Sequence, residues 1–397
     1  MNVADAAIAA FRRAFGVDPT SLALAPGRVE LLGNHTDYNG GLVLAAAIDR
    51  HTAVAARPAP GGRVRAYASG FDARDDFELS EPRSGNPGSW ATYVRGVTWA
   101  VQQDYGPCID GLDIAICGDI PQGAGLSSSA SLQAAVGLVL GVGVDGDEAR
   151  MRLARVLRRS ENEFVGVASG LLDQFSVLMG RDGFALSLDC RSLEYERVSL
   201  SDPAPAIVVC DTKTSRLLAD GMYNRRRAES DRVVDHFRRH TTGVKIESLR
   251  DLTLEKLMND WHTLDDPDRR RARHVLTENE RVRRGVIALK EEKVAEFGRL
   301  MSASHASSRD DFDNSSPALD AMVESAEGSP GFLGGKLSGA GWAGCTVNLV
   351  EAAHAVEFAA AVAERYERRT GVAPAIHVCR AAAGAHLRAL DSRGDHA

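Results

Sequence analysis

The stretch "GDIPQGAGLSSSASLQAAVGLVL", residues 118 to 140, decides the fold more than any other part of the chain. Gly123 and Gly125 allow backbone conformations that other residues resist, and serines follow where an Ala- and Leu-rich helix begins. Backbone N–H groups and the positive end of the helix dipole then point into the loop, where a phosphate group satisfies both. We interpret the stretch as an anion cradle, with a plain serine-capped helix as the alternative. It is not a Walker A loop, because no Gly-Lys-Ser/Thr closes it.

A second stretch, "ENEFVGVASGLLDQF" (residues 161 to 175), places carboxylates among apolar residues. Asp173 lies near Gly170, and Glu161 precedes it by twelve residues on a helical pattern. A buried carboxylate is costly unless a cation or hydrogen bonds stabilise it. Taken alone, Asp173 is a helix cap or a salt-bridge partner. Next to a phosphate loop, carboxylates that bind Mg²⁺ or receive a nucleophile's proton are expected.

A third stretch, "GKLSGAGWAGC" (residues 335 to 345), is a second glycine-rich turn between two apolar runs. Such a turn also occurs in tight hairpins, so it is a weak signal by itself. Together with the first loop, it indicates a phosphate-binding region that is closed from two sides.

The bulk composition limits the partners of the chain. The 397 residues are 44% hydrophobic and carry a formal net charge of -7, which fits a soluble globular protein and gives no electrostatic reason to bind nucleic acid or an anionic membrane. Two basic runs, residues 225 to 227 and "DPDRRRARH" at residues 266 to 274, are interpreted as solvated helix faces.

The cysteines and the apolar runs bear on location. The six cysteines form no CxxC pair, so reduced and mostly buried thiols are expected. The N-terminus is amphipathic rather than signal-like, and no run of about 18 apolar residues occurs. We therefore expect a cytoplasmic protein that is a monomer or a weak oligomer.

Apolar periodicity predicts a mixed α+β chain in two halves, with the change near residue 200. Strands are expected near residues 22 to 33, 41 to 56, 62 to 69 and 111 to 117. Helices are expected at residues 1 to 16, within 128 to 164, and at 221 to 240, 269 to 290 and 292 to 305.

These stretches, together with "APGRVELLGNHTDYNGG" (residues 25 to 41), resemble the GHMP kinase superfamily and its galactokinase branch. The first corresponds to the superfamily's phosphate loop, the third to its last motif, and residues 25 to 41 to the galactokinase signature. Further segments, such as "WATYVRGV" (90 to 97) and "DGMYNRRRAES" (220 to 230), follow in the same order. The resemblance extends from about residue 12 to about residue 385.

The resemblance implies a fold and a reaction. The fold is a two-domain α+β GHMP kinase: an N-terminal domain of the S5 domain 2-like type over residues 1–200, a C-terminal ferredoxin-like domain over residues 201–397, and an active site in the cleft between them. The reaction is transfer of the ATP γ-phosphoryl group to the C1 hydroxyl of galactose, and the implied cofactors are ATP and Mg²⁺.

The resemblance also assigns catalytic residues and metal ligands. Asp173 accepts or orients the proton of the C1 hydroxyl, and Arg28 is its partner beside the transferred phosphoryl group. A guanidinium there favours the ionised carboxylate and offsets charge on the phosphoryl oxygens. Ser129 and Glu161 match the ligands of Mg²⁺.

The remaining assignments concern the two substrates. The residues that match the ATP site are Gly123, Ala124, Gly125, Leu126, Ser127, Ser128, Ser129 and an adenine-stacking Trp90. Those that match sugar contacts are Asn34, His35, Asp37, Gly170 and Tyr223.

One departure concerns the sugar site. The family pattern has Asn at the position of Glu30 and Glu at the position of Asn34, where the acid is expected to hold the C6 hydroxyl. Four residues along an extended strand span about 13 Å, so Glu30 is not expected to reach the place that Asn34 occupies. Either Asn34 is a tolerated variant in a galactokinase, or it relaxes selection at C6 and admits galacturonate or arabinose. A non-catalytic sugar sensor is the remaining alternative.

Overall fold

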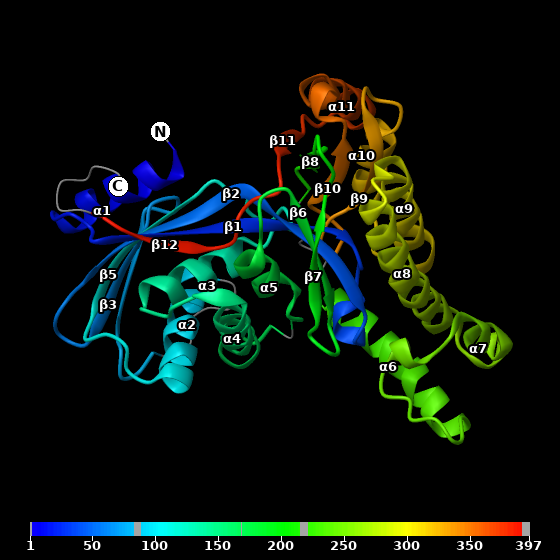
Figure 1. Cartoon of the computed structure of the whole chain (residues 1–397), viewed down its shortest axis with the longest axis horizontal. Helices are drawn as coiled ribbons and strands as arrows, with labels where there is room; N and C mark the ends of the chain where they lie inside the picture. The colour runs from blue at the N-terminus through cyan, green and yellow to red at the C-terminus, as the bar shows by residue number, and fades with distance from the viewer. Residues whose placement is uncertain (1, 83–88, 168, 215–220, 391–397) are drawn as a thin grey trace.

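The computed structural model describes residues 2–82, 89–167, 169–214 and 221–390, and its chain forms two lobes (Figure 1). The first lobe holds a sheet with the strand order β12-β1-β2-β5-β3-β4, and β6 and β7 extend it from β2. Its strands are β1 (Ser21–Leu32), β2 (Leu42–Pro58), β3 (Arg63–Ala68), β4 (Ala73–Glu78), β5 (Leu112–Gly118), β6 (Phe184–Asp189), β7 (Tyr195–Ser199) and β12 (His386–Ala389).

Helices cover both faces of this sheet. One face packs on α2 (Trp90–Tyr105), α3 (Ser128–Val139), α4 (Gly146–Arg159) and α5 (Leu172–Met179), and together they form the largest apolar core of the described chain. The helix α1 (Val3–Phe15) packs on the other face, where its buried Ala7 and Phe11 meet residues of β1, β2 and β5. The alternating apolar residues of β1 account for both cores, because successive side chains point to opposite faces.

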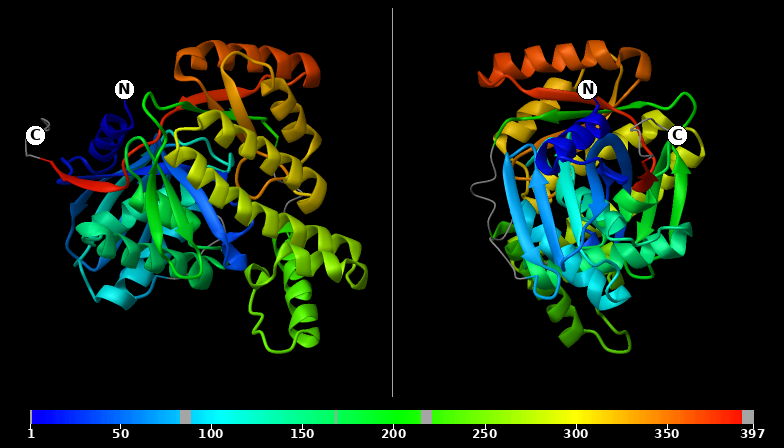
Figure 2. Two further views of the ribbon diagram at one scale, coloured as in Figure 1. Left: turned by 45° about the vertical axis from the view of Figure 1, so that its right-hand side comes forward. Right: turned by 90° about the vertical axis from the view of Figure 1, so that its left-hand side faces the viewer.

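The second lobe has a four-stranded antiparallel sheet with the order β11-β8-β10-β9. Its strands are β8 (Ala206–Asp211), β9 (Phe332–Leu337), β10 (Cys345–Val350) and β11 (Ala375–Cys379). One face carries α10 (Pro317–Ala326) and α11 (Ala355–Thr370), which completes a β-α-β-β-α-β unit and confirms the ferredoxin-like expectation. Figure 2 shows α11 on the outer side of this lobe.

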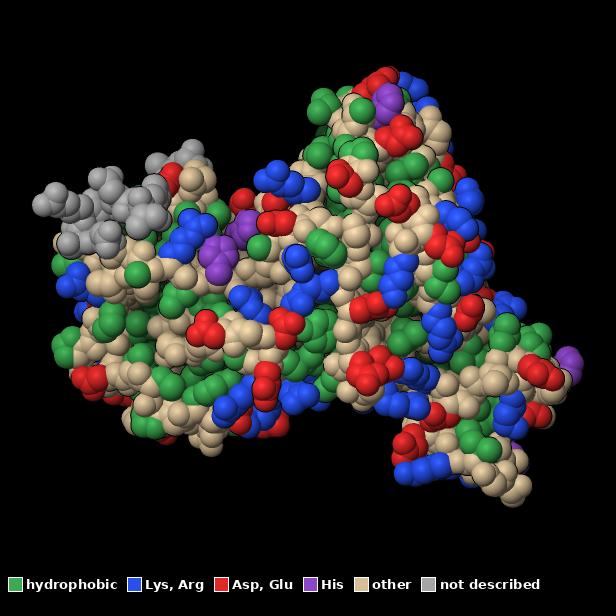
Figure 3. All heavy atoms as spheres, viewed as in Figure 1, with side chains coloured by type: hydrophobic (Ala, Val, Ile, Leu, Met, Phe, Trp, Pro, Cys, Tyr) green, Lys and Arg blue, Asp and Glu red, His purple; other side chains and the backbone are tan. Residues whose placement is uncertain are grey.

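An insertion between β8 and α10 supplies the remaining helices. These are α6 (Met222–His240), α7 (Leu254–Asn259), α8 (Asp266–Lys290) and α9 (Val294–Ser307). Phe297 and Met301 of α9 pack with Val29 and Leu31 of β1 and with Val347 of β10, so one apolar cluster joins the lobes. Acidic and basic side chains are interspersed on the face shown in Figure 3.

The division at residue 200 stays a prediction, and the structure adds one feature to it. The last strand, β12, returns to the first lobe and pairs antiparallel with β1, from Ser21 opposite Ala389 to Leu24 opposite His386. The predicted helices and strands occur within a few residues of their expected limits. The elements that were not predicted are β4, β12, α2, α5, α7 and α10.

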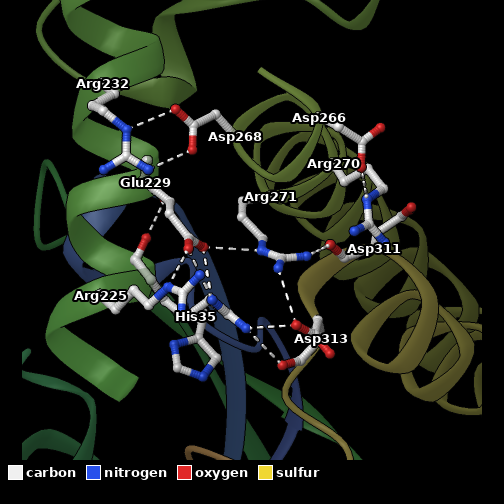
Figure 4. Close-up of polar contacts among 12 residues, drawn as sticks. His35, Arg225, Glu229, Arg232, Asp266, Asp268, Arg270, Arg271, Asp311 and Asp313 are labelled. Carbon is white, nitrogen blue, oxygen red and sulfur yellow. Dashed lines mark hydrogen bonds and ion pairs between the residues drawn. The ribbon is translucent and has the colours of Figure 1, made fainter. Parts of the chain in front are cut away.

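The interpretation of both basic runs as solvated faces is wrong for two arginines. Arg226 and Arg271 are buried, and both donate to the buried carboxylate of Glu229. Each also donates to the Asp313 carboxylate, as Figure 4 shows for Arg271. Charged side chains tolerate burial when they are paired in this way, and the acids that pair with them come from other segments. The network holds α6 against α8.

The expectation of reduced thiols is confirmed for all six cysteines, of which Cys117, Cys210, Cys345 and Cys379 are buried. Among the described helices, none is long and apolar enough to cross a membrane.

Candidate active site

A cleft of about 310 Å³ brings together most of the predicted site residues. It is lined by the end of β1, the phosphate loop before α3, the start of α5 and the turn between β9 and β10. A second hollow of about 300 Å³ adjoins it and shares Gly123, Ser128 and Ser129 with it. Because the two hollows meet at the phosphate loop, they can hold two ligand groups next to each other.

The strand β1 aims its polar residues into the cleft. Val29 and Leu31 belong to the core between the lobes, whereas Arg28 and Glu30 point to the opposite side and line the cleft. The backbone N–H of Arg28 donates to the Leu126 carbonyl at 3.1 Å, which ties the strand to the phosphate loop.

Arg28 and Asp173, 145 residues apart, form the central ion pair of the cleft. The Arg28 Nε and Nη2 atoms lie 2.8 Å and 2.6 Å from Asp173 Oδ1, so two nitrogens of the guanidinium group contact the same carboxylate oxygen. The other oxygen, Oδ2, accepts from Ser127 Oγ at 2.6 Å. Arg28 Nη1 also donates to the Gly125 carbonyl at 2.6 Å. The structure therefore places the two predicted catalytic residues in contact with the phosphate loop.

The phosphate loop has the backbone geometry of an anion cradle. Gly123 and Gly125 have φ values of 72° and 76°, and Ser127 has 55°, directly before α3 begins at Ser128. The third glycine-rich stretch approaches from the other lobe, because a Cβ built on Gly344 would lie 3.2 Å from the Gly123 carbonyl oxygen. The two glycine-rich stretches thus lie against each other, one from each lobe.

Two predicted nucleotide residues occupy different surroundings. Ala124 is buried in the core between the lobes, so its side chain supports the loop rather than lining the cleft. Trp90 lines the second hollow together with Phe71, Tyr93 and Ile116. Flat apolar side chains of this kind suit a purine base, whose faces are also apolar.

Glu161 and Ser129 both face the cleft. Glu161 lies in a π-helical turn (Ser160–Val165), a distortion that often occurs at functional sites. Its Oε2 accepts from Ser169 Oγ and from Gln174 Nε2, each at 2.6 Å. Burial, with the Asp173 charge adding to it, raises the pKa of Glu161.

Asp37 presents its carboxylate to the cleft beside Gly170. A Cβ built on Gly170 would lie 2.0 Å from Asp37 Oδ2, so a side chain at this position cannot coexist with Asp37 as placed. Burial raises the pKa of Asp37 to about 6, and the charges of Glu30 and Asp173 act in the same direction. Hydroxyl groups that donate hydrogen bonds to this carboxylate would stabilise its charged form, which burial disfavours.

Replacing Gly170 by alanine is therefore expected to raise KM for the sugar that the family resemblance implies at least about tenfold, because Asp37 must turn away and the substrate hydroxyl groups lose their charged acceptor. Steady-state kinetics with saturating ATP would measure this effect. The matched control is Gly166→Ala, where no atom lies within 4 Å of the built Cβ, although its φ of 87° brings some strain. Thermal unfolding of both variants separates strain from loss of binding. An unchanged KM in Gly170→Ala would contradict the assigned position of Asp37.

His35 lines the cleft, but both ring nitrogens already have partners. Nε2 lies 3.0 Å from the Ala340 carbonyl and so carries the proton, and Nδ1 accepts from the Tyr38 hydroxyl at 3.0 Å. Burial lowers the pKa of His35 to about 3, which keeps the ring neutral. Tyr223 of α6 packs 5.5 Å from the His35 ring, centroid to centroid, and its pKa is raised by burial and by Asp37. His35 thus positions aromatic neighbours along this wall of the cleft.

The expectation that Glu30 lies far from Asn34 is wrong. Asn34 Nδ2 donates to Glu30 Oε1 at 3.1 Å. The estimate of 13 Å assumed a continuous extended strand, but β1 ends at Leu32 after a register shift. Gly33, with φ at 101°, then turns the chain back.

Sequence patterns missed several residues of the two hollows. Glu30 lines the first hollow but stood out in the sequence only as a departure from the family pattern. Lys336 does not line either hollow, but it forms a buried ion pair with Glu30 at 2.7 Å. Ser169, Tyr93, Phe71, Gly339 and Ala340 also line the hollows. Their signal is weak, because serine, glycine and aromatic residues occur in many contexts.

Comparisons with known proteins agree with this geometry. The galactokinase galactose-binding signature matches residues 9–58, the N-terminal domain of GHMP kinases matches residues 92–181, and the C-terminal domain matches residues 286–368. A galactokinase from Roseiflexus sp. is 42% identical over 378 residues, which cover 94% of each chain. The chain belongs to the galactokinase family. A second relative from Chloroflexus aurantiacus, also a galactokinase, is 41% identical over 95% of both chains.

Solved structures support the same family assignment. The galactokinase of Lactococcus lactis, in complex with galactose, has a TM-score of 0.90 at 33% identity and covers 97% of this chain and 100% of its own. A mevalonate kinase, with a TM-score of 0.61 and 18% identity over 90% of this chain, shares the fold. The chain is thus a galactokinase-family sugar kinase with the two-domain GHMP fold, and ATP is its phosphoryl donor.

Proposed function

We propose that this kinase transfers the γ-phosphoryl group of ATP to the C1 hydroxyl of galactose and forms galactose 1-phosphate. The observation that carries the proposal is the Arg28–Asp173 pair, which contacts the phosphate loop on one side and shares a cleft with Asp37 and Tyr223 on the other. The named relatives are galactokinases, and the structure from Lactococcus lactis contains galactose, which supports this choice of sugar.

In this proposal Asp173 binds the C1 hydroxyl through an oxygen and takes up its proton as the phosphoryl group is transferred. Ser127 and Arg28 hold the carboxylate in one orientation. The phosphoryl group passes through a loose transition state, so positioning and charge compensation account for most of the rate. The Arg28 guanidinium and the N–H groups at the start of α3 supply that compensation.

The residues also fit Mg²⁺, which prefers oxygen ligands and retains several from phosphate and water. Glu161 lines the cleft with one oxygen engaged by Ser169 and Gln174, and the Ser129 hydroxyl lies on the same wall. Within the described residues no group of three or more His, Cys, Asp or Glu side chains could hold a metal by itself. We propose that these two residues hold a nucleotide-bound Mg²⁺, which neutralises phosphate charge when bound.

We propose that the sugar binds in the part of the cleft that is lined by Asn34, His35, Asp37, Gly170 and Tyr223, with Asp37 accepting bonds from adjacent ring hydroxyls. The adenine ring lies in the second hollow against Trp90. The free thiols and the net charge support a cytoplasmic enzyme that acts on a small molecule, and we expect it to be a monomer or a weak oligomer.

The raised pKa of Asp37 predicts a pH effect on sugar binding. With a pKa of about 6, the ionised fraction falls about fourfold between pH 7.5 and 5.5, and KM for the sugar should rise by a similar factor. Asp37→Asn should raise KM and make it nearly independent of pH in this range. The contribution of Asp37 to the free energy of unfolding falls as pH rises from about 4 to 6, because its carboxyl group binds the proton more tightly in the folded state than in the unfolded state. A flat KM profile in the wild type would contradict the assignment.

The function is tested by ADP release with galactose, N-acetylgalactosamine, galacturonate, arabinose and glucose. We expect galactose to give the highest kcat/KM by at least about tenfold, because the site is built to bind sugar hydroxyls. Phosphorus NMR of the product should show a phosphate on C1. A clear preference for galacturonate or arabinose would favour altered C6 selectivity, and no turnover on any sugar would favour a sensor.

A further inference from the structure

Glu30 and Asn34 form one hydrogen-bonded pair on the wall of the cleft, and the pair is anchored from the other lobe. Glu30 Oε1 accepts from Asn34 Nδ2 at 3.1 Å and from Lys336 Nζ at 2.7 Å. Lys336 is fully buried, and its ammonium group also donates to the Leu337 carbonyl at 3.0 Å. The carboxylate of Glu30 is thus held in place and its charge is compensated.

The amide of Asn34 has no hydrogen-bonding capacity left for a substrate. Its Nδ2 donates to Glu30 Oε1 and to the Gly339 carbonyl at 2.8 Å. Its Oδ1 accepts from Asn314 Nδ2 at 2.8 Å and from Ser308 Oγ at 3.4 Å. A side-chain amide offers two donor hydrogens and two acceptor lone pairs, and all four are used here. Asn34, which is 1% exposed, therefore supports the wall without an atom to offer to the sugar.

Glu30, by contrast, keeps an oxygen for the substrate. Its two hydrogen bonds both end on Oε1, and across the part of the chain that the structure describes Oε2 has no hydrogen-bond partner. The residue lines the same cleft as Asp173 and Asp37. Oε2 is therefore open to the cleft, and it can accept a hydrogen bond from a hydroxyl group that binds there.

The position of Glu30 along β1 indicates which hydroxyl group it meets. Arg28 and Glu30 face the same side in the regular part of the strand, opposite Ala47 and Ala45 of β2, and so lie about 7 Å apart. Arg28 contacts Asp173, where the C1 hydroxyl reacts. The separation of Arg28 and Glu30 along the strand is comparable to the length of a hexose ring. Glu30 therefore lies toward the end of the sugar that is opposite C1.

We infer that Glu30, through Oε2, is the residue that selects the C6 hydroxyl of the sugar, and that Asn34 positions it; this inference rests on the proposed function. The family pattern has the acid and the amide at the opposite positions. The Glu30 and Asn34 side chains are hydrogen-bonded to each other. With the acid and the amide exchanged between these two positions, this part of the cleft wall therefore still contains one carboxylate and one amide. The chain therefore retains a charged acceptor for C6, although position 34 lacks the acid.

The first test compares kcat/KM for galactose and 6-deoxygalactose in the wild type, Glu30→Gln and the exposed control Glu255→Gln. Glu30→Gln should reduce the preference for galactose at least about tenfold, chiefly through galactose, because a bond to a charged acceptor is lost. Glu255→Gln should leave it unchanged. Equal losses for both sugars, or an unchanged preference in folded Glu30→Gln, would overturn the inference.

The second test exchanges the pair. Asn34→Glu alone should lower kcat/KM for galactose about 100-fold, because it sets a second carboxylate against Glu30 and the Gly339 carbonyl. Adding Glu30→Asn should recover most of this loss and restore the preference for galactose to within about threefold of the wild type. No recovery would overturn the inference even if Glu30→Gln fails to fold. A wild type without galactose turnover would refute the proposed function, and the inference with it, whereas turnover without recovery refutes the inference alone.

Discussion

Asp173→Asn should lower kcat about 10³-fold and leave the dissociation constants of ATP and sugar within about threefold of the wild type. Asparagine has nearly the same shape and still bonds to Ser127 and Arg28, but it cannot take up the proton of the C1 hydroxyl or compensate the Arg28 charge. Loss of an interaction made mainly in the transition state lowers kcat more than it changes binding.

Initial rates of ADP release and calorimetric titration of both ligands would measure this effect. Asp110→Asn is a suitable control, since Asp110 is exposed and lies outside the cleft. Residual activity above about a tenth of the wild-type value would show that Asp173 only shapes the site. A proportional loss of sugar affinity would instead assign it to ground-state binding.

Arg28→Met should have a comparable effect on kcat, again about 10³-fold, because it removes the cation that both pairs with Asp173 and faces the transferred phosphoryl group. Arg28→Lys should retain part of the activity and still lose about 10²-fold. An ammonium group carries the charge but cannot approach Asp173 Oδ1 through two nitrogens and contact the Gly125 carbonyl with a third.

The same kinetic and binding measurements apply, with Arg57→Lys as the control on an exposed position of β2. Arg28 is only 6% exposed, so thermal unfolding must accompany the kinetics. The double variant Arg28→Met/Asp173→Asn should lose little more than either single variant, because the two residues act as one unit. Fully additive losses would contradict a shared role.

The phosphate loop shows what sequence patterns predict well. The conformation of this loop depends on local backbone preferences of its glycines and serines and of the helix that follows. The structure accordingly has positive φ values at the glycines and a helix that begins at Ser128. The same local logic predicts most helices and strands, because their apolar periodicity reflects one buried face. It also predicts free thiols, since the cysteines lack paired spacing.

Contacts between distant segments were predicted less well. Arg226 and Arg271 look like solvated charges in the sequence, and only the packing of α6 on α8 brings Glu229 and Asp313 to them. Ala124 belongs to a substrate loop by motif but packs into the core between the lobes. In both cases the surroundings of the residue come from segments far away in the sequence.

By itself, the sequence determined the family, the α+β architecture and the residue types at the site, because these follow from local backbone preferences, periodicity and a nearly full-length resemblance. Only the tertiary structure decided how Glu30 and Asn34 relate. A register shift and a turn at Gly33 bring their side chains into contact, and Lys336 arrives from the other lobe to hold them. Such a contact depends on the three-dimensional path of the chain and on a partner about 300 residues away, which no local pattern encodes.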